Sequence, residues 1–96
     1  MIVERFIRQI KHGKLNEALE LAKEGRKNIW PEFSCRIFTS NIGTMNTIVT
    51  ENEFEDMAER EKLYQQVVAK EEWGPWIDRW SELLTGNGAN EVWDLE

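Results

Sequence analysis

Three tryptophans in the last third of the chain have a spacing that suits a binding surface. Trp73, Trp76 and Trp80 stand at positions i, i+3 and i+7, so a helix through them places their indole rings on one face. Such a face forms the aromatic wall of an apolar ligand pocket, or it packs in the core or a dimer interface, which is the commoner use. A buried indole also needs an acceptor for its N–H group, so polar atoms are expected nearby.

Glu61 is the most unusual candidate for acid–base chemistry. At about 100° per residue it falls between Met57 and Tyr64 on the apolar stripe of its expected helix. A carboxylate there must be paired, protonated or placed at a wet pocket. We therefore expect Glu61 to be at least half buried and to contact a hydrogen-bond donor, for which Arg8 and Arg36 from the sheet are candidates. The interpretations left open are a structural ion pair or helix-edge position, a pocket acid–base group, and a plainly exposed residue.

Two further side chains complete the weak candidates for a catalytic base. His12 is the only histidine and lies in a turn, where it is either a solvated turn residue or a proton carrier at a pocket mouth. Tyr64 lies near Glu61 on the same expected helix. No Ser/His/Asp set, HExxH, CxxC, Walker loop or GxGxxG motif is present, and no metal site is expected. The single cysteine, Cys35, excludes an intrachain disulfide and is interpreted as a small hydrophobic residue in a strand.

Two β-α-β units in succession must position these residues. Each unit begins with a β-type run, passes into an amphipathic helix and ends in another β-type run. This order in 96 residues predicts an α+β fold, in which both helices cover one face of a four-stranded antiparallel sheet. The whole chain, 1–96, is expected to form one domain. The six segments are Met1–Lys11, Lys14–Trp30, Phe33–Asn41, Met45–Thr50, Phe54–Leu84 and Ala89–Glu96.

The second helix is expected to be interrupted. Asn52 is its expected N-cap, since acidic residues follow in the first turn. Gly74-Pro75 then predicts a break near Trp73 and a short helix from Pro75 to Leu84, because proline cannot donate the helical backbone hydrogen bond. Gly86 is the expected C-terminal stop.

Composition restricts the class of partner. The chain carries 18 acidic and 12 basic residues and a net charge of −6, which argues against binding to a nucleic-acid backbone. No run approaches the roughly 18 apolar residues of a membrane span, so no membrane partner is expected. The N-terminus enters a strand pattern directly and shows no signal-peptide pattern, so a cytoplasmic location is expected.

Three stretches of the chain resemble a known superfamily. They are the strand–turn–helix entry Ile7–Lys14, the hairpin Phe38–Thr50 with its Met45-Asn46-Thr47 start, and the aromatic segment Trp73–Trp80. Through them the chain resembles the dimeric α/β-barrel superfamily of ferredoxin-like domains, and within it small NIPSNAP-like proteins of unknown function. The resemblance implies a ferredoxin-like βαββαβ fold and a homodimer whose two sheets pack face to face. Apolar residues on both faces of the first two expected strands also favour a dimer, because two helices cover only one face.

The superfamily includes cofactor-independent monooxygenases, haem-degrading enzymes and isomerases, so the resemblance implies no single activity. Its haem-degrading members rely on a histidine late in the second helix, which this chain lacks, and no cofactor is expected. The first functional hypothesis is a homodimeric module that binds a small apolar molecule between helices and sheet. The alternative is a cofactor-independent monooxygenase or isomerase acting on an aromatic or polyketide-like substrate, which needs a base at the pocket. The sequence does not decide whether the protein is an enzyme.

Overall fold

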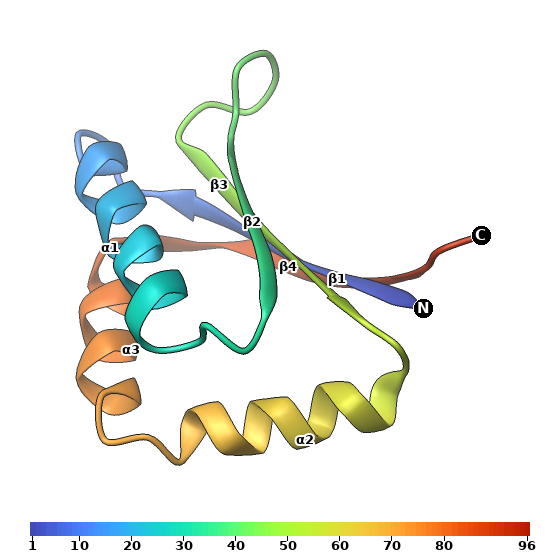
Figure 1. Ribbon diagram of the computed structural model, residues 1–96. Helices are drawn as coiled ribbons and strands as arrows, with labels where there is room; N and C mark the ends of the chain where they lie inside the picture. The colour runs from blue at the N-terminus through green and yellow to red at the C-terminus, as the bar shows by residue number, and fades with distance from the viewer.

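The computed structural model describes residues 1–96 and contains four strands and three helices. In chain order they are β1 (Ile2–Ile10), α1 (Leu15–Asn28), β2 (Ser34–Thr39), β3 (Thr47–Phe54), α2 (Met57–Val68), α3 (Trp73–Glu82) and β4 (Leu84–Asp94). The strands form one antiparallel sheet in the order β2-β3-β1-β4. Figure 1 shows all three helices on one side of this sheet. The ferredoxin-like α+β fold expected from the sequence is therefore confirmed, with the second helix divided into α2 and α3.

The third strand is longer than the sequence indicates. It continues past Thr50 to Phe54, because the chain keeps pairing with the start of β1. Asn52 is therefore a buried strand residue and not the expected N-cap. The N-cap of α2 is Asp56, whose carboxylate accepts a hydrogen bond from the backbone N–H of Glu59 at 2.8 Å. This extension of β3 places Asn52 in the sheet beneath the helices.

The second helix is interrupted just before Trp73, and the new helix begins at this residue rather than at Pro75. Pro75 instead lies in the first turn of α3, where its missing N–H removes no intrahelical hydrogen bond. Gly86 lies within β4 and is not a helix stop, since α3 leads almost directly into that strand. The helices have 14, 12 and 10 residues, and none is long and apolar enough to cross a membrane.

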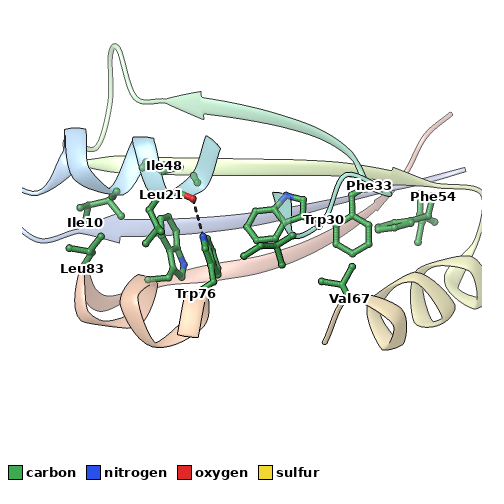
Figure 2. Close-up of a cluster of buried hydrophobic side chains, with 14 residues drawn as sticks. Ile10, Leu21, Trp30, Phe33, Ile48, Phe54, Val67, Trp76 and Leu83 are labelled. Carbon is green, nitrogen blue, oxygen red and sulfur yellow. Dashed lines mark hydrogen bonds between the residues drawn. The ribbon is translucent and has the colours of Figure 1, made fainter. Parts of the chain in front are cut away.

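One hydrophobic core lies between the sheet and the helices, as Figure 2 shows. The strands contribute Ile10, Ile48 and Phe54 from the face that the helices cover. The indole N–H of Trp76 in α3 donates to the backbone carbonyl of Leu21 in α1 at 2.9 Å. This hydrogen bond satisfies a buried donor and holds the two helices together.

The opposite face of the sheet carries no helix (Figure 1). Because side chains alternate along a strand, Phe38 and Trp93 point to this open face, and they are 46% and 54% exposed. Glu51 lies on the same face, where it is buried by Arg5 and Arg36, whose guanidinium groups pair with its carboxylate. Two large aromatic side chains therefore remain in contact with solvent beside a compact charged cluster.

Candidate ligand-binding cavity

A cavity of about 380 Å³ lies between the sheet and the helices. Sixteen residues line it, and twelve of them are hydrophobic. Each of the seven helices and strands contributes at least one of these residues, so the cavity exists only in the folded chain. Its volume and lining are typical of pockets that bury a small organic molecule.

Four tryptophans form the aromatic side of the cavity. Trp73, Trp76 and Trp80 line it from α3, and Trp30 lines it from the segment that follows α1. The rings of Trp76 and Trp80 are stacked with centroids 5.4 Å apart, and Trp30 meets Trp76 edge-on at 4.6 Å. These contacts hold the rings in place before any ligand binds. The structure thus brings the three tryptophans singled out in the sequence to one wall, while their contact with a ligand stays a prediction.

The polar groups in the lining are few. Arg8 is the only charged one. Its guanidinium donates to the carbonyl oxygens of Ile7 and Ala89 at 2.9 and 3.1 Å, and to Oδ1 of Asn90 at 2.6 Å. Asn52 is 3% exposed, and its Oδ1 is buried without a hydrogen-bond partner. The wall therefore combines one cation and several neutral polar groups with no carboxylate.

Tyr64 also lines the cavity, but its hydroxyl is hydrogen-bonded to Glu4, which forms a buried ion pair with Arg60. The O–H donates to Oε1 of Glu4 at 2.8 Å, and Nε of Arg60 donates to Oε2 of the same carboxylate at 2.7 Å. The Glu4 side chain is 2% exposed, so these two partners satisfy a charge that lies in the interior. Burial, and then the hydrogen bond to Glu4, raise the pKa of Tyr64. The phenol therefore stays neutral at physiological pH and is not a free base.

The expectation that Glu61 is buried is wrong. Its side chain is 60% exposed and does not line the cavity. The expected contact with an arginine exists, but the partner is the adjacent Arg60, whose Nη1 lies 2.7 Å from Oε1 of Glu61, and not Arg8 or Arg36. Helix α2 turns Arg60 and Tyr64 towards the sheet, and the next residue after Arg60, rotated by about 100°, points to solvent.

His12 and Cys35 have different environments. His12 is exposed in the turn between β1 and α1 and does not line the cavity. Cys35 is partly buried, packs against the core and lines the cavity. Burial raises the pKa of its thiol, which lowers the fraction of reactive thiolate. No group of three or more histidine, cysteine, aspartate or glutamate side chains is placed to hold a metal ion.

The sequence does not identify Glu4, Arg8, Asn52 and Arg60 as neighbours of one cavity. A signal exists for two of them, since Glu4 and Arg8 alternate with apolar residues on one face of β1. A charged residue on an apolar strand face must find a partner or a wet pocket. Asn52 and Arg60 carry no such signal, because their positions depend on the length of β3 and the rotation of α2.

Comparison with known proteins places this architecture in a family. The NIPSNAP family model matches residues 6–91. The chain belongs to the NIPSNAP family. An uncharacterised NIPSNAP domain protein from Burkholderia xenovorans superposes with a TM-score of 0.89 at 21% sequence identity, over 100% of this chain and 95% of the other. A NIPSNAP family protein from Agrobacterium tumefaciens gives a TM-score of 0.85 at 23% identity, over 97% and 90% of the two chains.

The fold of this NIPSNAP protein is also found in proteins outside the family. An antibiotic biosynthesis monooxygenase superposes with a TM-score of 0.73 at 16% identity, over 100% of this chain and 99% of the other. At such identities the likeness shows the fold alone. A comparison with curated proteins gave no match. The family and the ferredoxin-like architecture expected from the sequence are thus confirmed, and the function must be argued from the cavity.

Proposed function

We propose that this NIPSNAP protein binds a small apolar molecule in the cavity between its helices and its sheet. The cavity itself carries the proposal, because it is large enough for such a molecule and twelve of its sixteen lining residues are hydrophobic. The N–H group of Trp76 is already satisfied by Leu21, so this part of the wall offers apolar ring atoms and no free donor. Burial of apolar surface is then the main source of affinity.

Titration with the neutral probe 1-naphthaleneacetamide, followed by calorimetry and tryptophan fluorescence, tests this proposal. We expect saturable binding of one molecule per chain with a negative heat-capacity change. Thr50 lines the cavity from β3, so Thr50→Phe should fill part of it and abolish or strongly weaken binding. The matched control is Thr44→Phe, at an exposed loop position outside the cavity, which should bind as the wild type does. No binding to the folded wild type, or unchanged binding by folded Thr50→Phe, would contradict the proposal.

We also propose that the protein is a homodimer whose two open sheet faces pack together. The exposed rings of Phe38 and Trp93 support this arrangement, since they lie on the face without helices. Light scattering should give twice the 11.4 kDa mass of one chain. Phe38→Glu should produce a monomer, whereas Met57→Glu, at an equally exposed apolar position on α2, should not. A wild type of monomer mass at micromolar concentration would refute the dimer.

The alternative function is a cofactor-independent monooxygenase or isomerase that acts on an aromatic or polyketide-like substrate. The fold shared with an antibiotic biosynthesis monooxygenase supports it. Such chemistry needs a base within hydrogen-bond reach of the substrate. Glu61 and His12 lie outside the cavity, and Tyr64 is a neutral phenol bonded to Glu4, so we favour binding without chemistry. Conversion of an aromatic probe by the purified protein in air would favour the enzyme. The cytoplasmic location stays a prediction from the sequence.

A further inference from the structure

We infer that the ligand of this cavity is a small aromatic carboxylate, whose rings lie in the apolar cavity and whose anionic group binds Arg8. The inference rests on the proposed function and adds the chemical class of the ligand. Arg8 is the only charged residue among the sixteen that line the cavity. In a chain with 18 acidic and 12 basic residues, a cavity wall with one cation and no acid has the opposite charge balance to the rest of the protein.

Arg8 has no counter-ion in the protein. Its guanidinium is held by three neutral oxygens and lies over the Phe6 ring, 5.4 Å from the ring centroid, and no carboxylate lies within ion-pair distance of it. Arg5, Arg36 and Arg60, by contrast, each pair with a glutamate. Desolvation by partial burial lowers the pKa of Arg8, yet a guanidinium remains charged at neutral pH. A partly buried cation without a counter-ion is unfavourable, and an anionic ligand removes that cost.

The Arg8 side chain lies along β4. Gly88 pairs with Arg8 across the sheet and packs against the β1 backbone, since a Cβ on Gly88 would lie 2.3 Å from the carbonyl oxygen of Ile7. From there the Arg8 guanidinium reaches Ala89 and Asn90. The same guanidinium borders an open depression formed by residues 86–90, so it stands where the cavity meets the surface.

This placement matches a ligand with one apolar end and one charged end. A guanidinium has five N–H donors in a planar fork, which fits the two oxygens of a carboxylate. Three hydrogen bonds to protein oxygens orient the Arg8 fork without using every donor. The same cavity is lined by Trp30, Trp73, Trp76 and Trp80, which give it an apolar, aromatic wall that suits an aromatic body.

A matched pair of probes tests the inference, namely 1-naphthaleneacetate and its neutral amide, 1-naphthaleneacetamide. The two differ in charge but hardly in shape, so the ratio of their dissociation constants isolates the contribution of the carboxylate. We expect the wild type to bind the carboxylate about tenfold or more tightly than the amide, as for a hydrogen-bonded charged group. Raising the salt concentration should reduce this preference and leave amide binding almost unchanged.

Arg8→Gln should bring the ratio of the two dissociation constants to about one, whatever it does to the affinity for the amide, and Arg8→Lys, which keeps the charge, should retain part of the preference. The matched control is Arg79→Gln, because Arg79 is an exposed arginine of α3 that does not line the cavity. It should behave as the wild type does.

The outcomes separate this inference from the function on which it rests. If the wild type binds the amide and binds the carboxylate no more tightly, the inference is overturned and the apolar pocket stands. If neither probe binds, both are overturned. A preference that survives in Arg8→Gln also overturns the inference. Should Arg8→Gln fail to fold, the wild-type ratio with its salt dependence and the behaviour of Arg8→Lys decide the matter.

Discussion

Glu4 and Arg60 join the sheet to α2 through a buried ion pair. Glu4 projects from β1 into the interior, where a lone carboxylate would be unstable. Arg60 and Tyr64, one turn apart on α2, both bind it. The Arg60 guanidinium also lies over the Tyr64 ring, 4.7 Å from its centroid. Together these contacts fix the rotation of α2 about its axis, and this rotation turns Glu61 towards solvent.

We predict that Arg60→Ala lowers the free energy of unfolding by about 3 kcal/mol, because it leaves Glu4 buried without a cation. Urea denaturation at neutral pH measures the loss. Adding Glu4→Gln to Arg60→Ala should recover most of it, as a double-mutant cycle would show. Glu61→Ala should cost less than about 0.5 kcal/mol, since its side chain is exposed. A greater loss from Glu61→Ala than from Arg60→Ala would contradict this account.

At the scale of elements, the end of α1 is shaped by the tryptophan that follows it. The Trp30 ring covers Gly25 so closely that a Cβ on Gly25 would lie 2.2 Å from Cη2 of the indole. The backbone N–H groups of Ile29 and Trp30 both donate to the Gly25 carbonyl, at 2.8 and 2.9 Å, which turns the chain at the end of the helix. Trp30 thereby reaches Trp76 and the cavity wall.

We predict different effects for alanine at two helical glycines. In an open helix, replacing glycine by alanine stabilises by about 0.5–1 kcal/mol. Gly74→Ala in α3 should fall short of this gain, because Pro75 follows and disfavours helical backbone in a preceding residue that carries a Cβ, and its effect should stay within about 0.5 kcal/mol. Gly25→Ala should instead destabilise by about 1–3 kcal/mol, since the new methyl group displaces the Trp30 ring. Thermal denaturation measures both. Gly25→Ala should also weaken binding of 1-naphthaleneacetamide, and a gain of stability in this variant would disprove the close packing.

At the scale of the whole molecule, the two faces of the sheet are covered in different ways. The helices bury one face, whereas Glu51 on the open face is covered by its own partners, Arg5 and Arg36. The hydrogen bond from Arg5, with further attraction from Arg36, holds the pKa of Glu51 below its ordinary value despite desolvation. The unfolded chain therefore takes up this proton more readily than the folded protein does.

We predict that this difference appears in the pH dependence of stability. A carboxylate with a lowered folded-state pKa stabilises the fold above its ordinary pKa of 4.5, and this contribution is lost as the pH falls through the lower folded-state pKa. The wild type should exceed Glu51→Gln in unfolding free energy at neutral pH, and the gap should close below pH 4.5. Urea denaturation across this range measures it. Glu53→Gln, which loses only a 3.5 Å contact with Arg36, is the control with a smaller effect, and a pH-independent gap for Glu51→Gln would refute the prediction.

Local patterns in the sequence are enough to predict the fold class, the order of the elements and the break in the second helix. Strand alternation and helical periodicity are short-range signals, and a proline is tolerated in the first turn of a helix but not in its interior, so Gly74-Pro75 indicates a helix start and a break before it. The spacing of Trp73, Trp76 and Trp80 likewise predicts one aromatic face, because it follows from helix geometry alone. The family resemblance adds the ferredoxin-like topology.

Contacts between distant residues account for what these patterns do not predict. The strand β3 extends to Phe54 because β1 is there to pair with it, and Glu61 faces solvent because Glu4 holds Arg60 across 56 positions of sequence. Arg8 stands at the cavity mouth because the Ala89 carbonyl, 81 positions away, accepts its hydrogen bond. Each partner is brought near by the packing of the whole chain, so the polar half of the candidate site emerges only when sheet and helices are assembled.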